Sequence, residues 1–250
     1  MNDLVSIITP SYNAEFFIAR TINSVLLQTY SNWELLIVDD CSRDSSATII
    51  NDYVNKDKRI KYFKTEKASG SPVKPRNIAI EKAHGRYIAF LDSDDIWLPT
   101  KLEEQLKLFD GEKVAVVYSN YEKINENGDR SNRIIKAPAE INYQGLLKGN
   151  VIGNLTGMYD TEKVGKVYCR NIHHEDYILW LSILKKGFIA KSTNTVTALY
   201  RVRNNSVSSN KLKVLTWQWN ILRNVEKLPF YKSVYCFMAY AIKAILKAVK

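Results

Sequence analysis

The stretch YIAFLDSDDIWLP, from Tyr87 to Pro99, joins an apolar run to a cluster of like charges. Residues 87–91 have the length and composition of a buried β-strand. Three carboxylates follow within four positions, at Asp92, Asp94 and Asp95. Carboxylates so close together repel one another unless a cation neutralises them or one of them takes up a proton. The stretch therefore predicts a buried strand that ends in a site for a positively charged partner.

Apolar runs of strand length alternate with segments of helical periodicity on both sides of this stretch. The other predicted strands are residues 4–9, 33–39, 60–64 and 114–120, with helices between them. Near-continuous apolar strands separated by helices are typical of a parallel sheet that is covered on both faces. We therefore expect an α/β fold with a mostly parallel, doubly wound sheet. Such sheets bind ligands at the carboxyl ends of their strands.

Two more predicted strands end in polar residues. TPSYN closes the first strand, and DDCSRDSS, which begins with Asp39 and Asp40, follows the second. Ionised carboxylates only accept hydrogen bonds, so these two suit the N–H and O–H donors of a base and a ribose. Capping of the following helix explains them equally well. The sequence contains no GxGxxG or GxxxxGK[ST] motif, which disfavours a dinucleotide or P-loop phosphate site.

Hard carboxylate oxygens suit a Mn or Mg ion. Because Mg usually takes one or two carboxylates together with substrate phosphates, the cluster of Asp92, Asp94 and Asp95 predicts a metal–diphosphate complex. Arg76 stands near the start of a predicted helix, where it and the helix amides could share an anion. The alternatives are that the acidic residues cap the helix after Pro99 and that Arg76 is a surface arginine.

Residues 121–172 are polar and only weakly periodic, so we expect long loops and short elements there. After them, HHEDYILWLSILKKG places Glu175 and Asp176 ahead of an amphipathic helix. Acids are common in a first helical turn. A sugar-transfer site also needs a base to take a proton from a hydroxyl, and Asp176 is the candidate. The adjacent His173 and His174 lack the spacing of metal ligands.

The net charge of +10 is unevenly distributed along the 250 residues. Residues 201–250 contain ten Lys or Arg and a single acid, Glu226, so the rest of the chain is nearly neutral. This pattern disfavours a nucleic acid as partner and favours an anionic surface that meets the tail. The three cysteines form no CxxC pair, and the first residues do not read as a secretory signal. We therefore expect a cytoplasmic protein.

The uncharged segment VYCFMAYAI, residues 234–242, is followed by three lysines. It is too short to span a bilayer, which takes about 20 apolar residues. We expect an amphipathic helix that places the protein peripherally on the inner face of the plasma membrane, attracted by anionic lipid. The alternative is a terminal helix packed on the body, with Trp217 and Trp219 in the core.

The ordered set of motifs resembles the family 2 inverting glycosyltransferases, which have the GT-A fold. The tail is similar to that of bacterial enzymes that build teichuronic acid, capsule or O-antigen chains. Residues 121–172 match the family little. The matching segments run in family order from Val5 to Ser208 and are VSIITPSYN, SVLLQTYSNWELLIVDDCSRDSS, PRNIAIEKAHGRYIAFLDSDDIWLP, HHEDYILWLSILKKG and YRVRNNSVS.

The resemblance assigns roles to individual residues. Asp176 would be the general base, with Glu175 beside it, and Asp94 and Asp92 of the DxD motif would hold Mn or Mg. Some relatives carry a His near Arg203 that helps to hold the metal, and this sequence lacks it. The other residues implied in substrate binding, with Asp92 and Glu175, are Thr9, Pro10, Tyr12, Asp39, Asp40, Arg76, Arg201 and Arg203.

The resemblance also implies a reaction, in which an acceptor hydroxyl attacks the anomeric carbon of a nucleotide diphosphate sugar and inverts its configuration. UDP is the most frequent nucleotide of the family, and the acceptor would be a glycan or a lipid-linked glycan in bacterial surface polysaccharide synthesis. Residues 1–120 would bind the donor, residues 121–208 would bind the acceptor and carry the base, and residues 209–250 would form a helical, basic tail.

Two other functions fit part of the pattern. One is a non-catalytic subunit of a polysaccharide assembly complex that binds a nucleotide sugar, although such a subunit has no need of a base. The other is a phosphatase of the haloacid dehalogenase type, which also places DxD at a strand end with Mg. In that class the motif normally ends the first strand, whereas here it ends the fourth predicted strand.

Overall fold

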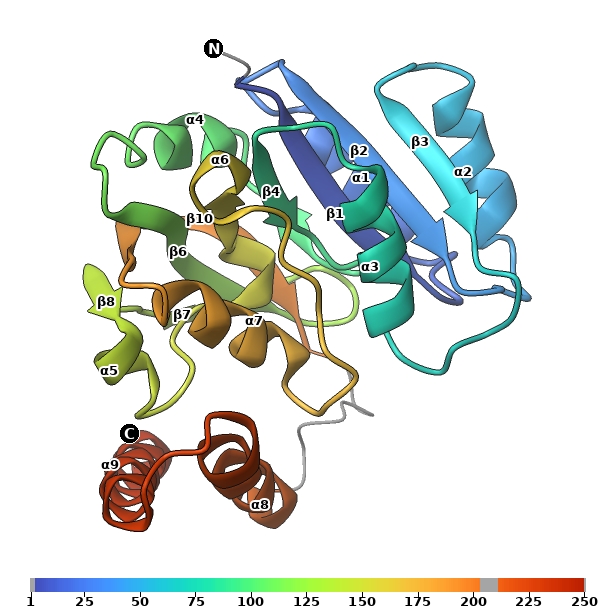
Figure 1. Ribbon diagram of the computed structural model, residues 1–250. Coiled ribbons are helices and arrows are strands. Elements are labelled where there is room, and N and C mark those ends of the chain that lie inside the picture. Colours follow the sequence, from blue (N-terminus) through green and yellow to red (C-terminus); the bar gives the residue numbers. More distant parts are fainter. Residues whose placement is uncertain (1–2, 203–210, 250) are drawn as a thin grey trace.

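The computed structural model describes residues 3–202 and 211–249, and Arg203 therefore lies outside the described residues. Within them the chain forms an α/β body around one mixed sheet, with a pair of C-terminal helices beneath it (Figure 1). The strand order is β3-β2-β1-β4-β9-β6-β10-β5, with β7 paired to β6 and β8 paired to β10.

The first half of the sheet is parallel, as its continuous apolar strands predict. In it β1 (Val5–Ser11) lies between β2 (Trp33–Asp39) and β4 (Tyr87–Phe90), and β3 (Ile60–Lys64) forms the edge. All residues of β1, β2 and β4 are buried. The three strand ends that the sequence marks as polar therefore meet at one edge of this half.

The second half of the sheet is mixed because the three-residue strand β9 (Met158–Asp160) runs antiparallel between β4 and β6 (Val114–Ile124). Strand β10 (Ile189–Arg201) is parallel to β6. The sequence does not predict β9, since three residues are too few to show a period. The remaining strands, all antiparallel to a neighbour, are β5 (Ile96–Trp97), β7 (Arg130–Ile135) and β8 (Glu140–Asn142).

Helices cover both faces of the sheet because strand side chains alternate between two cores. Ile8 and Phe90 belong to the core that also contains α3 (Val73–Lys82) and α7 (Glu175–Leu184). Ile7 and Ala89, one position away, belong to the opposite core. That second core contains residues of α1 (Ile18–Leu26), α2 (Ser46–Val54) and α4 (Lys101–Leu106). The body is thus doubly wound.

Short elements fill the weakly periodic region, as expected. They are α5 (Tyr143–Leu146), a 3₁₀ turn (Asn154–Thr156) and α6 (Thr161–Val164), with β7, β8 and β9. Gly157, which follows the 3₁₀ turn, packs directly on the indole of Trp180 in α7. A Cβ at position 157 would lie 2.3 Å from the Trp180 ring, so the close approach of this segment to α7 requires glycine.

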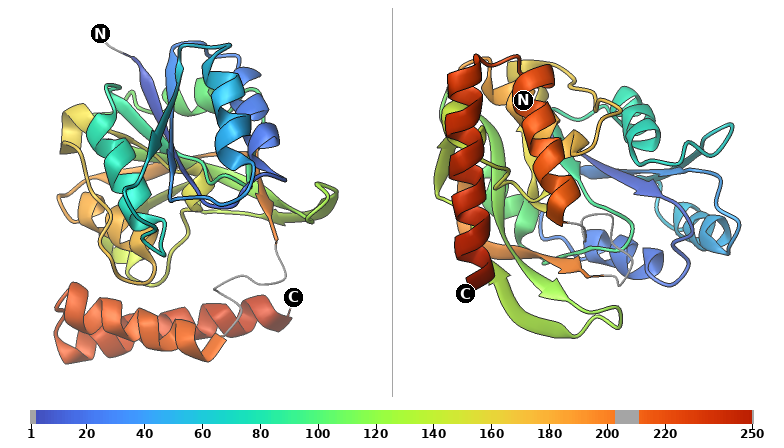
Figure 2. Two further views of the ribbon diagram at one scale, coloured as in Figure 1. Left: turned by 90° about the vertical axis from the view of Figure 1, so that its right-hand side faces the viewer. Right: turned by 90° about the horizontal axis from the view of Figure 1, so that it is seen from below.

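The C-terminal segment is a helical hairpin that packs on the α7 side of the body. Helix α8 (Lys211–Asn220) continues as one π-helical turn (Ile221–Val225), and α9 (Phe230–Val249) runs back alongside it (Figure 2). Trp217 stacks on His173 with ring centroids 4.3 Å apart, and Tyr143 and Lys185 both donate to Glu226. The packing of the tail on the body that the sequence allows is thus observed, but Trp217 and Trp219 are only partly buried and do not belong to the core. None of the helices in the described ranges has the length and apolarity that a bilayer crossing needs.

Candidate functional site

The acidic stretch after β4 lies level with the end of β1. Leu91 donates its N–H to the carbonyl of Ile8, so Asp92 follows one residue past this bond, beside Thr9 and Pro10. Strand β2 ends in the same register, because Ser11 is opposite Asp39. Adjacent parallel strands therefore bring three sequence-distant polar ends to one edge of the sheet.

Arg76 joins the acidic stretch to α7. Its Nη2 donates to Asp92 Oδ1 and its Nη1 donates to Glu175 Oε1, both at 2.6 Å. The arginine is only 4% exposed, so it is not the surface residue of the alternative interpretation. Burial alone would lower the pKa of Arg76, but the charges of Asp92 and Glu175 raise it, and the side chain stays ionised. One guanidinium thus holds α3, the DxD turn and the first turn of α7 together.

Asp95 is the most enclosed of the three aspartates. It is 1% exposed and accepts the backbone N–H of Arg201 at 2.9 Å. Burial, and then the charges of Asp94 and Asp92, raise its pKa well above that of an ordinary aspartate. A carboxyl in this position relieves repulsion by taking up a proton. Asp92 and Asp94 remain partly exposed, in contrast to Asp95.

The three aspartates do not cap the helix after Pro99. Residues 96–97 form β5, and α4 begins only at Lys101 with Thr100 at its N-cap. The acids in the first turn of α4 are Glu103 and Glu104. The capping alternative is therefore wrong.

The DxD turn suits a cation that takes most of its ligands from water or substrate. In residues 3–202 and 211–249 no three His, Cys, Asp or Glu side chains gather as metal ligands. Asp92 and Asp94 offer two partly exposed carboxylates from one turn. A Mg or Mn ion that completes its shell with water and substrate phosphates needs no more than this from the protein.

Asp176 lies in the first turn of α7, next to Glu175. Asn150 donates from Nδ2 to Asp176 Oδ2 at 3.1 Å. Burial and the neighbouring Glu175 charge raise the pKa of Asp176 to about 6, although Arg76 acts in the opposite direction. A carboxylate with this pKa is ionised at neutral pH and yet basic enough to take a proton from a hydroxyl.

Asp39 and Asp40 are both buried and both already accept hydrogen bonds from the protein. Asp39 receives the N–H and hydroxyl of Ser42 and the hydroxyl of Tyr62. Asp40 receives the backbone N–H groups of Ser69 and Gly70 and the hydroxyl of Ser69, which closes the loop before α3 over the end of β2. A nucleobase would reach either carboxylate only by exchanging some of these bonds.

The end of β1 presents hydroxyl groups that lack partners. Thr9 Oγ1 and Ser11 Oγ are buried and make no hydrogen bond, whereas Tyr12 is 52% exposed. Buried hydroxyls in proteins nearly always have partners, so two exceptions at the end of one strand, where a ligand site is predicted, are informative. Pro10 lies between them on the same strand. Ser11 was not among the residues predicted from the sequence.

Arg201, which the resemblance assigns to substrate binding, is the last residue of β10. Its Nε donates to the Asp94 carbonyl, and its Nη1 donates to the carbonyls of Asn125 and Glu126. Arg201 is 2% exposed. It therefore ties the DxD turn to the β6–β7 hairpin, while the predicted partner Arg203 lies outside the described residues.

Two tyrosines near the carboxylates were not predicted from the sequence. Tyr121 and Tyr200 pack edge to face with ring centroids 5.9 Å apart. Burial raises the pKa of Tyr121 to about 12, and the charges of Asp95 and Asp176 add to this effect. The charges of both Asp95 and Asp176 thus act on Tyr121. It comes from the weakly periodic region, where no sequence signal could identify it.

An open groove runs along α3 and the loop before it. Its wall includes Ser69, which also holds Asp40, and Tyr168 on the loop that leads to α7. The side chain of Asn77 makes two hydrogen bonds with the backbone of Cys169 and joins the two sides of the groove.

Comparison with known proteins identifies the family. The family model described as "Glycosyl transferase family 2" matches residues 6–169, and the chain belongs to this family. It is 44% identical to TuaG of Bacillus subtilis, named for a glycosyltransferase of teichuronic acid biosynthesis, over 98% of this chain and 97% of the relative. It is 42% identical to WfgD of Escherichia coli, named as a UDP-Glc:alpha-D-GlcNAc-diphosphoundecaprenol beta-1,3-glucosyltransferase, over 98% of this chain and 94% of the relative. The chain is therefore an enzyme of the glycosyltransferase class, which excludes the phosphatase alternative.

Solved structures confirm the GT-A fold. The structure of residues 1–349 of TarS from S. aureus, determined in complex with UDP-GlcNAc, superposes with a TM-score of 0.73. It covers 95% of this chain, which in turn covers 71% of it, at 22% sequence identity. A mannosyltransferase from Pyrobaculum calidifontis, in complex with GDP-Man and Mn²⁺, superposes with a TM-score of 0.69 at 14% identity, over 98% of this chain and 75% of its own. At these identities the likeness concerns the fold.

The substitution Arg76→Met tests the bridge between the DxD turn and α7. It leaves Asp92 and Glu175 without a counter-charge in a partly buried place, so we expect the free energy of unfolding to fall by about 2 kcal/mol. Urea denaturation at pH 7 measures this change. Lys107→Met is the matched control because the Lys107–Glu103 pair is exposed, and we expect no measurable change in the free energy of unfolding. Equal losses for both variants would show that the Arg76 bridge contributes no more than a surface ion pair.

The substitution Asp176→Asn tests the raised pKa of the base. The folded protein binds this proton more tightly than the unfolded chain, with a pKa of about 6 against an ordinary value of 3.8. The wild-type protein therefore has its full stability below the Asp176 pKa of the unfolded chain. It loses part of that stability as the pH rises through the Asp176 pKa of the folded protein. Since Asp176 is partly exposed, we expect the metal-free variant to be more stable by about 1 to 2 kcal/mol at pH 8. The two proteins should be equally stable near pH 4 in thermal or urea unfolding, and a pH-independent difference would contradict the assignment.

Proposed function

We propose that this family 2 glycosyltransferase moves a sugar from a UDP-sugar to a hydroxyl of a lipid-linked glycan, with Mn or Mg and with inversion, during synthesis of a bacterial surface polysaccharide. The Arg76 bridge carries the proposal, because it joins the DxD turn to the helix that bears Asp176. The name of a 42% identical relative, a glucosyltransferase that uses UDP-Glc and a diphosphoundecaprenol-linked acceptor, supports the donor and acceptor classes.

Residues 1–120 supply the donor site in this proposal. Thr9 and Ser11 have buried hydroxyls without partners at the end of β1, and a bound nucleotide would satisfy them. Asp92 and Asp94 would hold the cation, which when bound neutralises the charge that develops on the departing diphosphate. A neighbouring fold was determined with a GDP-sugar and Mn²⁺, which supports the use of a divalent metal.

Asp176 performs the proton transfer. With a pKa of about 6 it is ionised at neutral pH and accepts the proton of the acceptor hydroxyl as the oxygen attacks the anomeric carbon. Glu175 already pairs with Arg76, so it balances charge, and Asp176 remains the base. Attack from the face opposite the diphosphate inverts the anomeric configuration.

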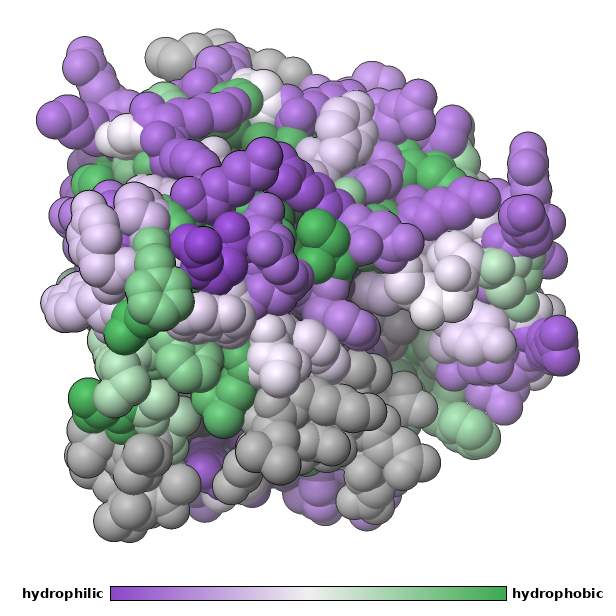
Figure 3. All heavy atoms as spheres, turned by 60° about the horizontal axis from the view of Figure 1, so that its bottom comes forward, coloured by the Kyte–Doolittle hydropathy of each residue, from purple (hydrophilic) through white to green (hydrophobic). Residues whose placement is uncertain are grey.

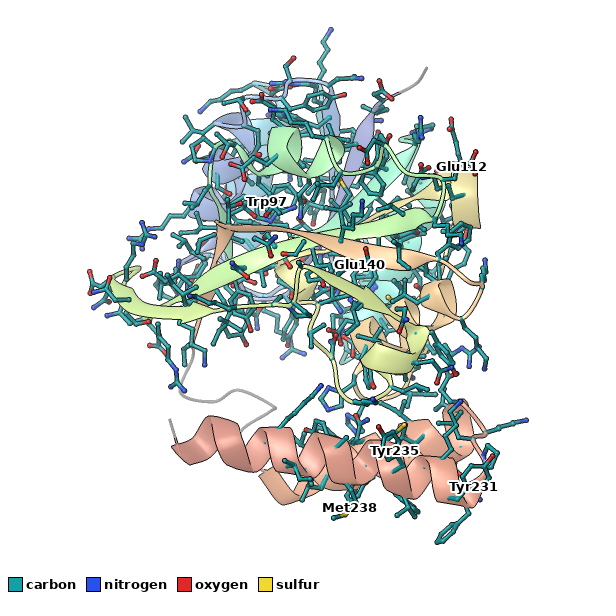
Figure 4. The ribbon with its side chains drawn as sticks, turned by 90° about the vertical axis from the view of Figure 1, so that its left-hand side faces the viewer. Trp97, Glu112, Glu140, Tyr231, Tyr235 and Met238 are labelled. Atoms are coloured by element: carbon teal, nitrogen blue, oxygen red, sulfur yellow. The ribbon has the colours of Figure 1, made fainter. Side chains whose placement is uncertain are left out.

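Helix α9 would meet the membrane that contains a lipid-linked acceptor. Its exposed large apolar side chains recur at helical spacing, and in Figure 4 the labelled Tyr231 and Met238 lie on the side that faces away from the sheet. Green side chains gather at the lower left of Figure 3, where α9 lies. Lys227 and Lys243 at the two ends of this stretch are exposed and suit anionic headgroups. The apolar face consists of Phe230, Tyr231, Val234, Met238 and Ile242, each 37–76% exposed, whereas the exposed Tyr235 accepts a hydrogen bond from Lys148 of the body.

Calorimetric titration tests the donor site. We expect UDP to bind with Mn present, to bind at least tenfold more weakly without it, and to lose the Mn dependence in Asp94→Ala, because the carboxylates hold the cation that meets the diphosphate. dTDP and GDP are titrated alongside to compare nucleotides. Tight UDP binding that ignores both Mn and the substitution would contradict metal-dependent donor binding.

Vesicle co-sedimentation tests the membrane surface. We expect the protein to bind vesicles of phosphatidylglycerol and phosphatidylethanolamine in preference to phosphatidylcholine vesicles. The double variant Tyr231→Ser, Met238→Ser should bind at least tenfold more weakly, since it removes apolar area from the membrane-facing side. Phe16→Ser is the control, because Phe16 is 78% exposed but lies on the loop before α1. An equal loss with Phe16→Ser would rule out α9 as the docking face.

A further inference from the structure

Asn150 has an amide whose orientation is fixed by the protein. Its Oδ1 accepts the backbone N–H of Ile152 at 3.0 Å, and its Nδ2 donates to Asp176 Oδ2 at 3.1 Å. A backbone N–H can only donate, so the carbonyl oxygen of the amide must face Ile152. The amide nitrogen is then the atom that faces Asp176.

We propose that Asn150 is the positioning residue for the general base. By binding Oδ2 it orients the carboxylate and leaves Oδ1 to take the proton from the acceptor hydroxyl. The proposal rests on the proposed role of Asp176 as base and adds to it a residue that neither the family motifs nor the comparisons assign. Asn150 does not itself touch the reacting atoms in this scheme.

The turn that carries Asn150 is held from two directions. Tyr177, the neighbour of Asp176 on α7, donates its hydroxyl to the carbonyl of Leu146 at 2.7 Å. From the C-terminal hairpin, Gln218 donates to the carbonyl of Leu147 at 3.3 Å. These bonds fix the backbone of the turn relative to both α7 and α8. The position of the Asn150 amide beside Asp176 is therefore held by the surrounding structure.

Gly149 completes the turn under the last helix. Its φ of +123° is a conformation that side-chain-bearing residues rarely adopt, and a Cβ there would lie 2.9 Å from Cδ2 of Tyr240 on α9. The residue that precedes Asn150 is thus fixed by an element that belongs to the C-terminal hairpin. The same turn therefore contacts the C-terminal hairpin through Gly149 and the proposed base through Asn150.

Several charged or titratable groups face Asp176 besides Asn150. Glu175 adjoins it on α7, Arg76 faces it from α3, and Asp92 faces it from the turn after β4. Tyr121 on β6 and the Cys169 thiol on the loop before α7 are also within electrostatic reach. Since Asn150 donates to the charged form of Asp176, its removal should raise the pKa of the base above the value that these groups set.

Two variants separate positioning from a structural role. Asn150→Asp keeps an acceptor for the Ile152 N–H but removes the donor to Asp176, whereas Asn150→Ala removes both. We expect kcat for glycosyl transfer to fall about tenfold or more in both variants, with the donor KM within about twofold of wild type. The acid limb of the kcat profile should move upward by about half a unit for Asn150→Ala and further for Asn150→Asp. A merely structural role would lower the stability of Asn150→Ala without moving the acid limb of its kcat profile.

A second readout does not depend on activity. Carboxyl ¹³C NMR of aspartate-labelled protein, with the Asp176 signal assigned from Asp176→Asn, reports the pKa of this group directly. We expect an upward shift of this pKa in both Asn150 variants, larger for Asn150→Asp than for Asn150→Ala. Asn142→Asp is the matched control, because Asn142 also accepts a backbone N–H, that of Gly145, and should leave both the pKa and kcat unchanged.

The outcomes distinguish the two levels of the proposal. Absence of transfer by the wild-type protein to any lipid-linked acceptor would count against the proposed function, while the NMR titration still reports on the contact between Asn150 and Asp176. Wild-type transfer combined with an unchanged kcat and an unchanged Asp176 pKa in Asn150→Ala, which adds no charge, would overturn the positioning role. A shifted pKa together with a reduced kcat in both variants supports it.

Discussion

A single buried guanidinium between two carboxylates holds the site together. Arg76 comes from α3, Asp92 from the turn after β4 and Glu175 from the start of α7, and these positions are 16 and 99 residues away from Arg76 in the sequence. Taking a guanidinium out of water is costly unless its charge is matched, and here two carboxylates match it. The same contact sets the distance between the strand ends and α7, so the donor and acceptor sides of the proposed reaction depend on it.

The acidic cluster is tolerated for more than one reason. Arg76 neutralises Asp92 from one side, burial favours the protonated form of Asp95, and Arg201 ties the backbone of the turn to the β6–β7 hairpin. Even so, acids outnumber guanidinium groups around the turn. That remaining negative charge suits a cation, and it also contributes to the raised pKa of Asp176.

The parts of this protein with a strong sequence period were predictable, and the parts held by single contacts were not. Strands β1, β2 and β4 are continuous apolar runs, and their polar ends point to the site through the general geometry of parallel sheets. Strand β9 has three residues and no period, although it joins the two halves of the sheet. Asn150 and Tyr121 come from the polar region 121–172, where position relative to Asp176 depends on tertiary packing alone. Arg201 was expected to face the donor, but its bonds to backbone carbonyls are visible only once the hairpin is in place.

The contact between Tyr240 and Gly149 limits how freely the two ends of this enzyme can be recombined. A C-terminal hairpin that only anchored the enzyme could be exchanged between relatives without regard to the catalytic body. Here Tyr240 on the inner face of the hairpin packs against Gly149, which immediately precedes Asn150, the residue that binds Asp176. A chimera that carries another relative's tail would therefore need the matching turn as well, and inheritance of the hairpin and the turn should be coupled across lineages.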